Sequence, residues 1–472
     1  MQHVMNDVDQ LMTATRDCPV VVIGAGPVGL AAAAHLVERN VPFVVLECGA
    51  AVGANVLAWG HVQLFSPWQY CVDAAAERLL QASGWQSPPA DRFPTGAELV
   101  HAYLQPLAML PPIAGAIHLA TEVVRVTRHG LNKGDSRNRE RQPFAVHVRA
   151  ADGRTTVIQA AAIIDASGTY TNPNPLGAAG VPAPGEPEAA PQCVYGIPDV
   201  AGVDRMRYVG KRVAVVGSGH SAFQALLELL ALKQAHPTTQ ITWVIRRSTD
   251  ALETIYGGGA GDALPERGAL GQRMRAAVDA GQLALVCDWR TDAVVQTQAG
   301  VVLCDGMRQL APVDEVIVTT GFRPDVHMLG ELRVGLDEIV EAPHALAPHI
   351  DPNLHSCGTV PPHGIRELRH PEPGLFVVGM KSYGRAPTFL LLTGYEQVRS
   401  VVAGLAGDWQ AALDVQLVLP ETGVCSGPDA GACCVPVAQS VAMIDSCCAP
   451  APRTVTVHDI AVLLDAPASR CC

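Results

Sequence analysis

The sequence predicts an α/β fold with two Rossmann-like, three-layer domains and a disordered, cysteine-rich C-terminal tail. The domains are predicted because the order apolar strand, glycine turn, helix and second strand occurs at residues 18–49 and again at residues 210–248. The tail is predicted because the chain beyond about Val418 consists largely of Pro, Ala, Gly, Ser and Cys. A chain of 472 residues is long enough for two or three domains.

The first glycine turn reads G-A-G-P-V-G, directly after a strand and at the start of a helix. Gly24 permits the tight turn, Gly26 lets the backbone approach a pyrophosphate, and Gly29 lets helix and strand pack closely, with Pro27 in the same turn. Glu47 ends the next strand, 18 residues after Gly29, where a carboxylate would hydrogen-bond a ribose hydroxyl. The pattern predicts a dinucleotide site, and a glycine turn without a ligand is the alternative.

The second unit repeats this geometry, with Ala222 in the third glycine position. Its next strand ends in two arginines instead of an acid, and guanidinium groups there suit the 2′-phosphate of NADP. A solvated basic pair at a strand end is the alternative. The residues predicted to bind nucleotide in this unit are Gly217, Gly219, His220, Ser221, Arg246 and Arg247.

The segments around the second unit have short strand patterns. Residues 122–130 and 144–168 alternate or run apolar as antiparallel strands do, and we expect the charged insert 132–142 to be a solvated loop. Residues 172–191 are rich in Pro and Gly and predict an ordered crossing between domains. Residues 387–408 have the apolar spacing of a closing helix.

Charge and hydropathy exclude several classes of partner. The net charge is -12, so no basic field draws the chain to nucleic acid or to an anionic membrane. The N-terminus lacks a positively charged start followed by an apolar run, and no later stretch of about 20 residues is uninterruptedly apolar. We expect a cytoplasmic protein whose partners are small molecules.

Four segments, in this order, carry a resemblance to a family: VVVIGAGPVGLAAAAHL, KRVAVVGSGHSA, VTTGFRPD and GLFVVGMKSYG. They resemble the two-dinucleotide flavoprotein oxidoreductases, most closely the flavin-containing monooxygenase branch, over about residues 18–408. The resemblance implies that the first unit binds FAD and that the second, inserted into the first, binds NADPH. The implied domains are 18–190 (FAD domain, first part), 195–319 (NADPH domain), 320–412 (FAD domain, second part) and 413–472 (flexible Cys-rich tail).

The resemblance also implies two further cofactor contacts and contains two departures. Gly321 lies where the chain returns to the FAD domain, and Gly379 lies where relatives place a glycine-acid pair against the ribityl chain. Met380 replaces that acid, so a backbone N–H would have to make the contact instead. The FxGxxxH fingerprint of the family is missing before the second glycine turn.

A narrower resemblance is carried by WGHVQLFSPWQYCVD and by LVLPETGVCSG followed by cysteine pairs. Both segments resemble the flavoprotein monooxygenase-like proteins encoded in bacterial arsenic-resistance operons. This resemblance implies a metalloid context.

The absence of certain cysteine pairs from the sequence bears on which molecule accepts the electrons. Disulfide reductases of this fold need a dithiol beside the flavin, and the chain has neither a CxxxxC after the first unit nor a CxxC in the second. Flavin and nicotinamide carry the redox chemistry, so molecular oxygen becomes the predicted acceptor and sulfur, nitrogen or trivalent arsenic the oxygenated atom. The alternatives are a reductase of tail disulfides or thiophilic metal, and a metal-sequestering protein with a vestigial flavin fold.

Candidates for the reaction cavity come from three segments. The catalytic candidates are His220, Trp68 and His61. Trp59 and Phe65 are further candidates for the flavin-facing wall, and Gln63 is a candidate hydrogen-bonding residue. The alternative for the aromatic side chains is ordinary core packing. The alternative for His220 is a histidine that only starts the helix. Three residues after a strand are candidates for the flavin's pyrimidine ring or an anionic substrate: Lys381, Tyr383 and Arg385.

Seven of the 14 cysteines lie in the final 48 residues, and six of those seven form vicinal pairs. Adjacent thiolates offer two soft ligands to one thiophilic ion such as As(III), Hg(II), Zn(II) or Cu(I), whereas their spacing does not match a structural zinc site. A mobile tail that holds such an ion would raise its concentration near the active site. The predicted ligands are Cys433, Cys434, Cys447, Cys448, Cys471 and Cys472.

Overall fold

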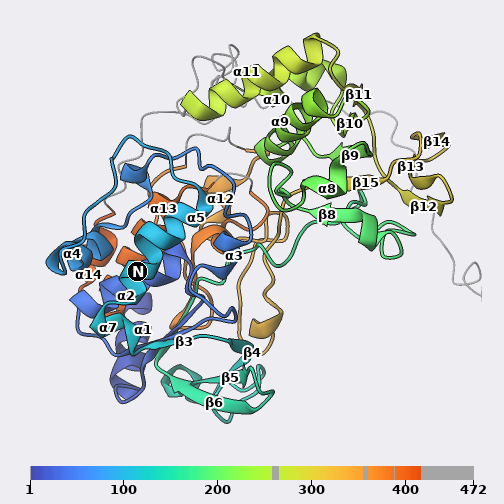
Figure 1. Ribbon diagram of the computed structural model, residues 1–472. Coiled ribbons are helices and arrows are strands. Elements are labelled where there is room, and N and C mark those ends of the chain that lie inside the picture. The colour runs from blue at the N-terminus through green and yellow to red at the C-terminus, as the bar shows by residue number, and fades with distance from the viewer. Residues whose placement is uncertain (1, 258–264, 355–359, 387–388, 416–472) are drawn as a thin grey trace, which may run out of the picture. The chain divides into compact units, whose positions relative to one another are not determined.

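A computed structural model describes residues 2–257, 265–354, 360–386 and 389–415 (Figure 1). These residues all belong to one compact unit, Met1–Pro428. From residue 416 onward the predicted tail, with its cysteine pairs and a short helix candidate at residues 455–466, lies outside the described residues.

The first sheet is parallel and combines strands from both ends of the described chain. Its order is β16-β7-β1-β2-β3, and β16 pairs with β7 with Leu375 opposite Ile163. The sheet therefore contains residues that precede the second sheet in sequence and residues that follow it. The strands are β1 (Val20–Ile23), β2 (Phe43–Leu46), β3 (Ile117–His118), β7 (Ala162–Asp165) and β16 (Leu375–Val377).

The second sheet is also parallel, in the order β11-β10-β9-β15-β8. Its last strand in sequence, β15, is followed by the segment that returns the chain to the first sheet. The predicted α/β class, with one Rossmann-like domain inserted into the other, is confirmed. The strands are β8 (Cys193–Tyr195), β9 (Arg212–Val216), β10 (Gln240–Val244), β11 (Ala284–Val286) and β15 (Glu315–Val318).

Each glycine turn leads into a helix that packs under further helices. In the first domain α2 (Pro27–Glu38) contacts α13 (Leu391–Leu405) and α4 (Ala74–Ala82), and every residue of α2 from Val28 to Leu36 is buried. In the second, α9 (His220–Ala235) contacts α11 (Pro265–Asp279) (Figure 1). The predicted closing helix is α13.

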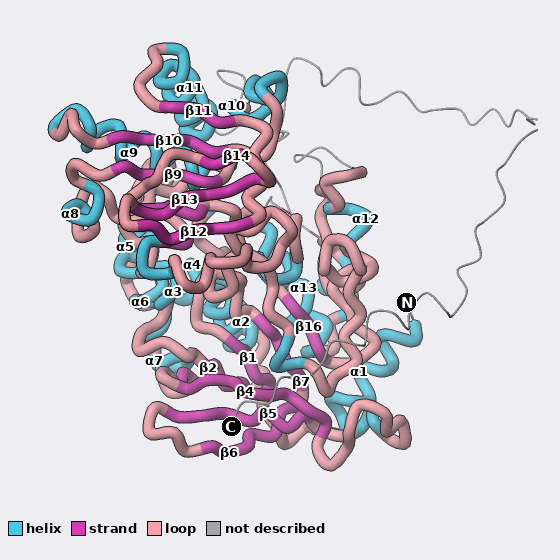
Figure 2. The backbone as a smooth tube through the Cα atoms, turned by 90° about the vertical axis from the view of Figure 1, so that its right-hand side faces the viewer, coloured by secondary structure: helices cyan, strands magenta, loops and turns pink. Residues whose placement is uncertain are grey.

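Two small antiparallel sheets accompany the parallel ones. The predicted strands between the glycine units form one of them, which Figure 2 shows as β4, β5 and β6 side by side. The other, in the order β12-β13-β14, is not predicted by the sequence analysis. The strands are β4 (Thr121–Arg128), β5 (Phe144–Ala150), β6 (Thr155–Ala160), β12 (Ala293–Thr297), β13 (Gly300–Asp305) and β14 (Arg308–Gln309).

The remaining α-helices are short, apart from an N-terminal helix that the sequence analysis did not predict. That helix buries Val8 and Leu11 in the core. Within the described residues, no helix has the length and apolar character needed to span a membrane. The helices are α1 (Gln2–Ala14), α3 (Ala54–Leu57), α5 (Gly96–Leu99), α6 (Gln105–Ala108), α7 (Pro111–Ala114), α8 (Arg205–Tyr208), α10 (Leu252–Tyr256), α12 (Ala347–Ile350) and α14 (Trp409–Leu413).

The charged insert 132–142 is more than the solvated loop that its composition predicts. Arg139 is buried and donates to Glu372 Oε2 at 2.8 Å, while Arg128 donates to Oε1 of the same carboxylate at 2.8 Å. Arg128 also lies over the Phe144 ring, 3.7 Å from its centroid. Because one carboxylate is shared by two guanidinium groups, the insert is fixed to the segment before β16.

Candidate active site

The two glycine turns open into one cavity of about 780 Å³. Residues from both domains line this cavity. It lies beyond the carboxyl ends of the parallel strands, where α/β proteins bind their ligands. The predicted cofactor-binding residues among the lining are Gly24, Gly26, Pro27, Glu47, Gly219, His220, Ser221, Gly321 and Gly379.

The three glycines of the first turn have different surroundings. Gly24 has φ +99°, and a Cβ there would lie 2.8 Å from the carbonyl oxygen of Ala166; a Cβ on Gly29 would lie 2.0 Å from the carbonyl oxygen of Gly24. A Cβ on Gly26 would meet nothing within 4 Å. Gly26 is also the N-cap of α2 and no side chain caps the helix, so unpaired N–H groups at its positive end suit a pyrophosphate.

Glu47 is 7% exposed and is held by the turn that it accompanies. Its Oε2 accepts from the Ala25 N–H at 2.7 Å, and its Oε1 accepts from the Gly49 N–H at 2.8 Å. Oε1 also accepts from Cys48 Sγ at 3.6 Å, whereas Oε2 has one donor among the described residues and a second lone pair that can accept a ribose hydroxyl. The turn, the uncapped helix and this carboxylate together fit the adenosine half of FAD.

The second turn repeats this division of roles. Gly217 has φ +137°, and a Cβ there would lie 2.5 Å from the carbonyl oxygen of Thr319. Gly219 is the N-cap of α9, has no atom within 4 Å of an added Cβ and lines the cavity. Arg246 and Arg247 follow β10, are exposed and do not line the cavity.

His220 begins α9 and lies at the cavity between the two domains. Its ring packs edge-on against Phe65, with centroids 5.4 Å apart, and also against Phe223 at 5.9 Å. The nearby Gln224 donates to the carbonyl of Gln63 at 3.2 Å. Segment 62–66 of the first domain therefore contacts the start of α9, and His220 lines the cavity into which both nucleotide turns open.

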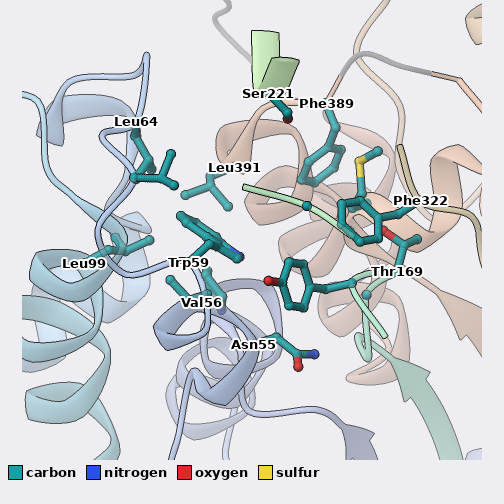
Figure 3. Close-up of a pocket in the computed structure, with 18 of the residues that line it drawn as sticks. Asn55, Val56, Trp59, Leu64, Leu99, Thr169, Ser221, Phe322, Phe389 and Leu391 are labelled. Carbon is teal, nitrogen blue, oxygen red and sulfur yellow. The ribbon is translucent and has the colours of Figure 1, made fainter. Parts of the chain in front are cut away.

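The cavity walls are mainly apolar. Figure 3 shows Trp59, Leu64 and Leu391 on one side and Phe322 and Phe389 on the other. The candidates Trp59, Phe65 and Gln63 line the cavity, whereas His61 and Trp68 do not. Trp68 is 1% exposed and packs in the core, because the turn after Pro67 directs its indole inward.

Three candidates after β16 have structural partners instead of ligand-facing positions. Lys381 is buried and donates to Asp165 Oδ2 at 2.7 Å and to Ser167 Oγ at 2.9 Å. Tyr383 is buried and packs edge-on against Phe389, and Arg385 pairs with Glu341. An anionic substrate is therefore not expected to meet Lys381 or Arg385, and Tyr383 lies behind Phe389 of the cavity wall and is not itself among the described lining residues.

The sequence analysis missed several lining residues. Tyr170 and Phe322 pack together with ring centroids 5.1 Å apart, and Asn55 and Phe389 come from two further segments. The sequence DASGT at the end of β7 could have indicated a ligand-binding turn, because a glycine follows a strand end there. In the structure Gly168 has φ +72° and lines the cavity. The other residues follow no local pattern.

Cysteine is missing from the lining residues that the structure describes. Cys71 lies in the core, and burial raises the pKa of its thiol to about 12, which keeps it protonated and a poor nucleophile. Across the described ranges, no cluster of three or more His, Cys, Asp or Glu side chains could hold a metal ion. The six predicted soft-metal ligands lie outside those ranges.

Comparison with known proteins gives a family match and a short sequence match. Residues 21–353 match the family described as pyridine nucleotide-disulphide oxidoreductase. Over 70 residues the chain is 43% identical to the Arabidopsis thaliana protein named "Probable indole-3-pyruvate monooxygenase YUCCA8", which is 14% of this chain and 16% of that protein. The sequence likeness thus spans about a sixth of the curated relative.

Solved structures share the fold over most of the chain. The bacillithiol disulfide reductase of Bacillus cereus is 20% identical with a TM-score of 0.58, over 82% of this chain and 98% of that one. The cadaverine monooxygenase DfoA of Erwinia amylovora, bound to FAD, is 15% identical with a TM-score of 0.57, over 86% and 99%. The ornithine hydroxylase PvdA of Pseudomonas aeruginosa is 16% identical with a TM-score of 0.53, over 84% and 99%.

Proposed function

Because the chain belongs to the pyridine nucleotide-disulphide oxidoreductase family, we propose that it is an FAD- and NADPH-dependent monooxygenase acting on a small, uncharged soft nucleophile. The family relationship makes the chain an FAD-dependent oxidoreductase that uses NAD(P)H. Oxygen as the acceptor, NADPH as the donor and the class of substrate are the parts that we propose.

The observation that supports oxygen as the acceptor is the cysteine-free lining of the described cavity. A flavoprotein that reduces a disulfide through its own thiols needs two of them beside the flavin. Cys71 is the next cysteine in the sequence after Cys48, which ends the first unit. Its side chain is buried, and its raised pKa keeps it a protonated thiol. Electrons that enter from NADPH therefore need an acceptor from outside the described cavity wall, and oxygen is the one that we propose.

FAD bound at the first turn would supply the electron transfer between NADPH and oxygen. The residues of the chain would hold its pyrophosphate at Gly26, its ribose at Glu47 and the second nucleotide at Gly219. Arg246 and Arg247, exposed after β10, would favour the 2′-phosphate of NADPH. The apolar walls would exclude water from the reacting atoms.

The charged side chains among the described lining residues, Glu47 and Arg267, do not favour an ammonium-bearing substrate. Glu47 is the one carboxylate among the described lining residues, and both of its oxygens accept backbone hydrogen bonds. The similar structures from Erwinia amylovora and Pseudomonas aeruginosa are named for cadaverine and ornithine, which carry ammonium groups. The part of the cavity wall that the structure describes offers no further carboxylate for an ammonium group, so a thioether or a trivalent arsenic compound suits it better.

The overall reaction balances with one oxygen molecule per substrate. NADPH, a proton, oxygen and the substrate give NADP⁺, water and the substrate carrying one oxygen atom. We further propose that the paired cysteines of the tail capture a thiophilic substrate in the reducing cytoplasm and deliver it to this cavity. The resemblance to proteins of arsenic-resistance operons supports arsenic as that element.

NADPH consumption by the purified yellow protein tests the proposal. We expect consumption to require oxygen and to rise with an uncharged aryl methyl sulfide, As(III) or a methylated trivalent arsenical, but not with cadaverine or ornithine. A variant that ends at Thr422 should keep its rate with the sulfide and lose apparent affinity for As(III). Anaerobic turnover with a thiophilic acceptor would favour a reductase instead, and purified protein without a flavin spectrum would favour a metal-sequestering role.

A further inference from the structure

We propose that Gln397, in the interior of α13, fixes the Gly379 peptide at the cavity wall and so positions the backbone of Met380, the residue that replaces the family's acid. Position 380 holds Met in this chain, and Gly379 and Met380 both line the cavity. This inference rests on the FAD part of the proposed function. It does not depend on the electron acceptor.

Gln397 holds both polar groups of Gly379, one directly and one through a serine. The side chain of Gln397 is fully buried, and its Oε1 accepts from the Gly379 N–H at 2.7 Å. Its Nε2 donates to Ser382 Oγ at 2.9 Å, and that hydroxyl donates to the carbonyl of Gly379 at 2.8 Å. The amide of Gln397 thus controls how the Gly379 peptide is oriented.

The hydrogen bonds allow one orientation of the amide. A backbone N–H can only donate, so the oxygen of Gln397 must face Gly379 and its nitrogen must face His363 Nε2, 2.9 Å away. His363 Nε2 must then accept, and the ring proton lies on Nδ1, which donates to the carbonyl of Pro361 at 3.0 Å. Burial lowers the pKa of His363 and favours this neutral imidazole.

The Gly379 backbone needs such support because its conformation and surroundings are restricted. Its φ is +69°, and an added Cβ would lie 3.2 Å from Val28 Cγ2 in the first turn of α2. A Cβ added to Gly394 of α13 would lie 3.6 Å from the Gly379 Cα and 2.6 Å from the same Val28 Cγ2. Gly379 therefore lies between the helix that begins at the FAD turn and the helix that carries Gln397, where a rotated peptide would change the cavity wall.

The test compares FAD affinity in two buried-polar variants of α13. Gln397→Leu leaves the Gly379 N–H without its acceptor, and we expect the dissociation constant for FAD to rise about five-fold or more, since an unsatisfied buried group costs at least that factor. Ser400→Ala is the matched control, because Ser400 is equally buried and bonds Ile365 N and Ala412 O without touching Gly379. We expect it to lower the thermal unfolding temperature of FAD-free protein while FAD affinity stays unchanged.

Gln397→Glu provides a partial rescue, because it keeps an acceptor oxygen for the Gly379 N–H but loses the donor to His363 Nε2 and Ser382 Oγ. Its FAD affinity should stay closer to that of the wild type than to that of Q397L. If Q397L does not fold, Gln397→Met, with a side chain of similar length and no acceptor for the N–H, takes its place. Unchanged FAD affinity in Q397L, or equal losses in Q397L and Ser400→Ala, would overturn the inference, whereas wild-type protein that binds no FAD would refute the proposed function itself.

Discussion

Replacing Lys381 by Met should destabilise the protein strongly, because Lys381 carries the counter-charge of a buried carboxylate. Lys381 is 3% exposed and Asp165 is fully buried, with 2.7 Å between Nζ and Oδ2. Removing one partner of a buried ion pair costs about 3–5 kcal/mol. For a domain of this size that corresponds to a fall in the unfolding temperature of roughly 6–20 °C. The two hydrogen bonds from Ser167 to Asp165 Oδ1 remain, which favours the lower half of that range.

The assay is thermal unfolding of FAD-free protein, with a second variant to separate charge from packing. In Lys381→Met/Asp165→Asn both charges are removed and the acceptor oxygen for Ser167 is kept, so the double variant should regain much of the lost stability. A fall of less than about 2 °C in Lys381→Met, equivalent to no more than about 1 kcal/mol, would refute the reasoning. Additive losses in the double variant would refute it as well.

Three further predictions concern the second, NADPH-binding domain. Gly219→Ala should leave the unfolding temperature unchanged, because the added Cβ meets nothing within 4 Å. It should weaken NADPH binding about ten-fold, and unchanged binding in titrations would contradict the role of the turn. Arg246→Ala/Arg247→Ala should raise KM for NADPH and leave KM for NADH unchanged, and equal effects on both nucleotides would exclude 2′-phosphate recognition. Burial raises the pKa of Glu228 to about 7, so folding disfavours its ionised form and stability falls as pH rises from about 4.5 to 7. Glu228→Gln should therefore raise the unfolding temperature more at pH 8 than at pH 4.5, and an equal change at both would disprove this titration.

The fold and the glycine turns could be predicted because their determinants are local. Gly29 must be glycine since a Cβ would collide with the carbonyl of Gly24, five residues earlier in the same unit. Glu47 reaches the same turn through the strand that directly follows α2, where it accepts the Ala25 N–H. A short stretch of sequence contains the whole constraint, so the pattern alone identifies the site.

The other site residues depend on contacts between distant segments. Lys381 follows a strand as a substrate-binding residue might, yet its partner Asp165 is 216 residues away in sequence. Arg139 likewise sits in a charged loop whose partner Glu372 is 233 residues away. Neither pairing has a periodic signal, and Trp59 and Trp68 differ in burial although they belong to one continuous segment. The three-dimensional structure was needed for each of these assignments.

Oxygen transfer from O₂ is the central claim, and isotope labelling tests it most directly. The purified, FAD-loaded full chain would be supplied with NADPH, an uncharged aryl methyl sulfide or methylated trivalent arsenical, and ¹⁸O₂, and the product would be analysed by mass spectrometry. The account predicts one ¹⁸O atom per product molecule, with one NADPH consumed for each. Product without ¹⁸O, or equal turnover in the absence of oxygen, would contradict it.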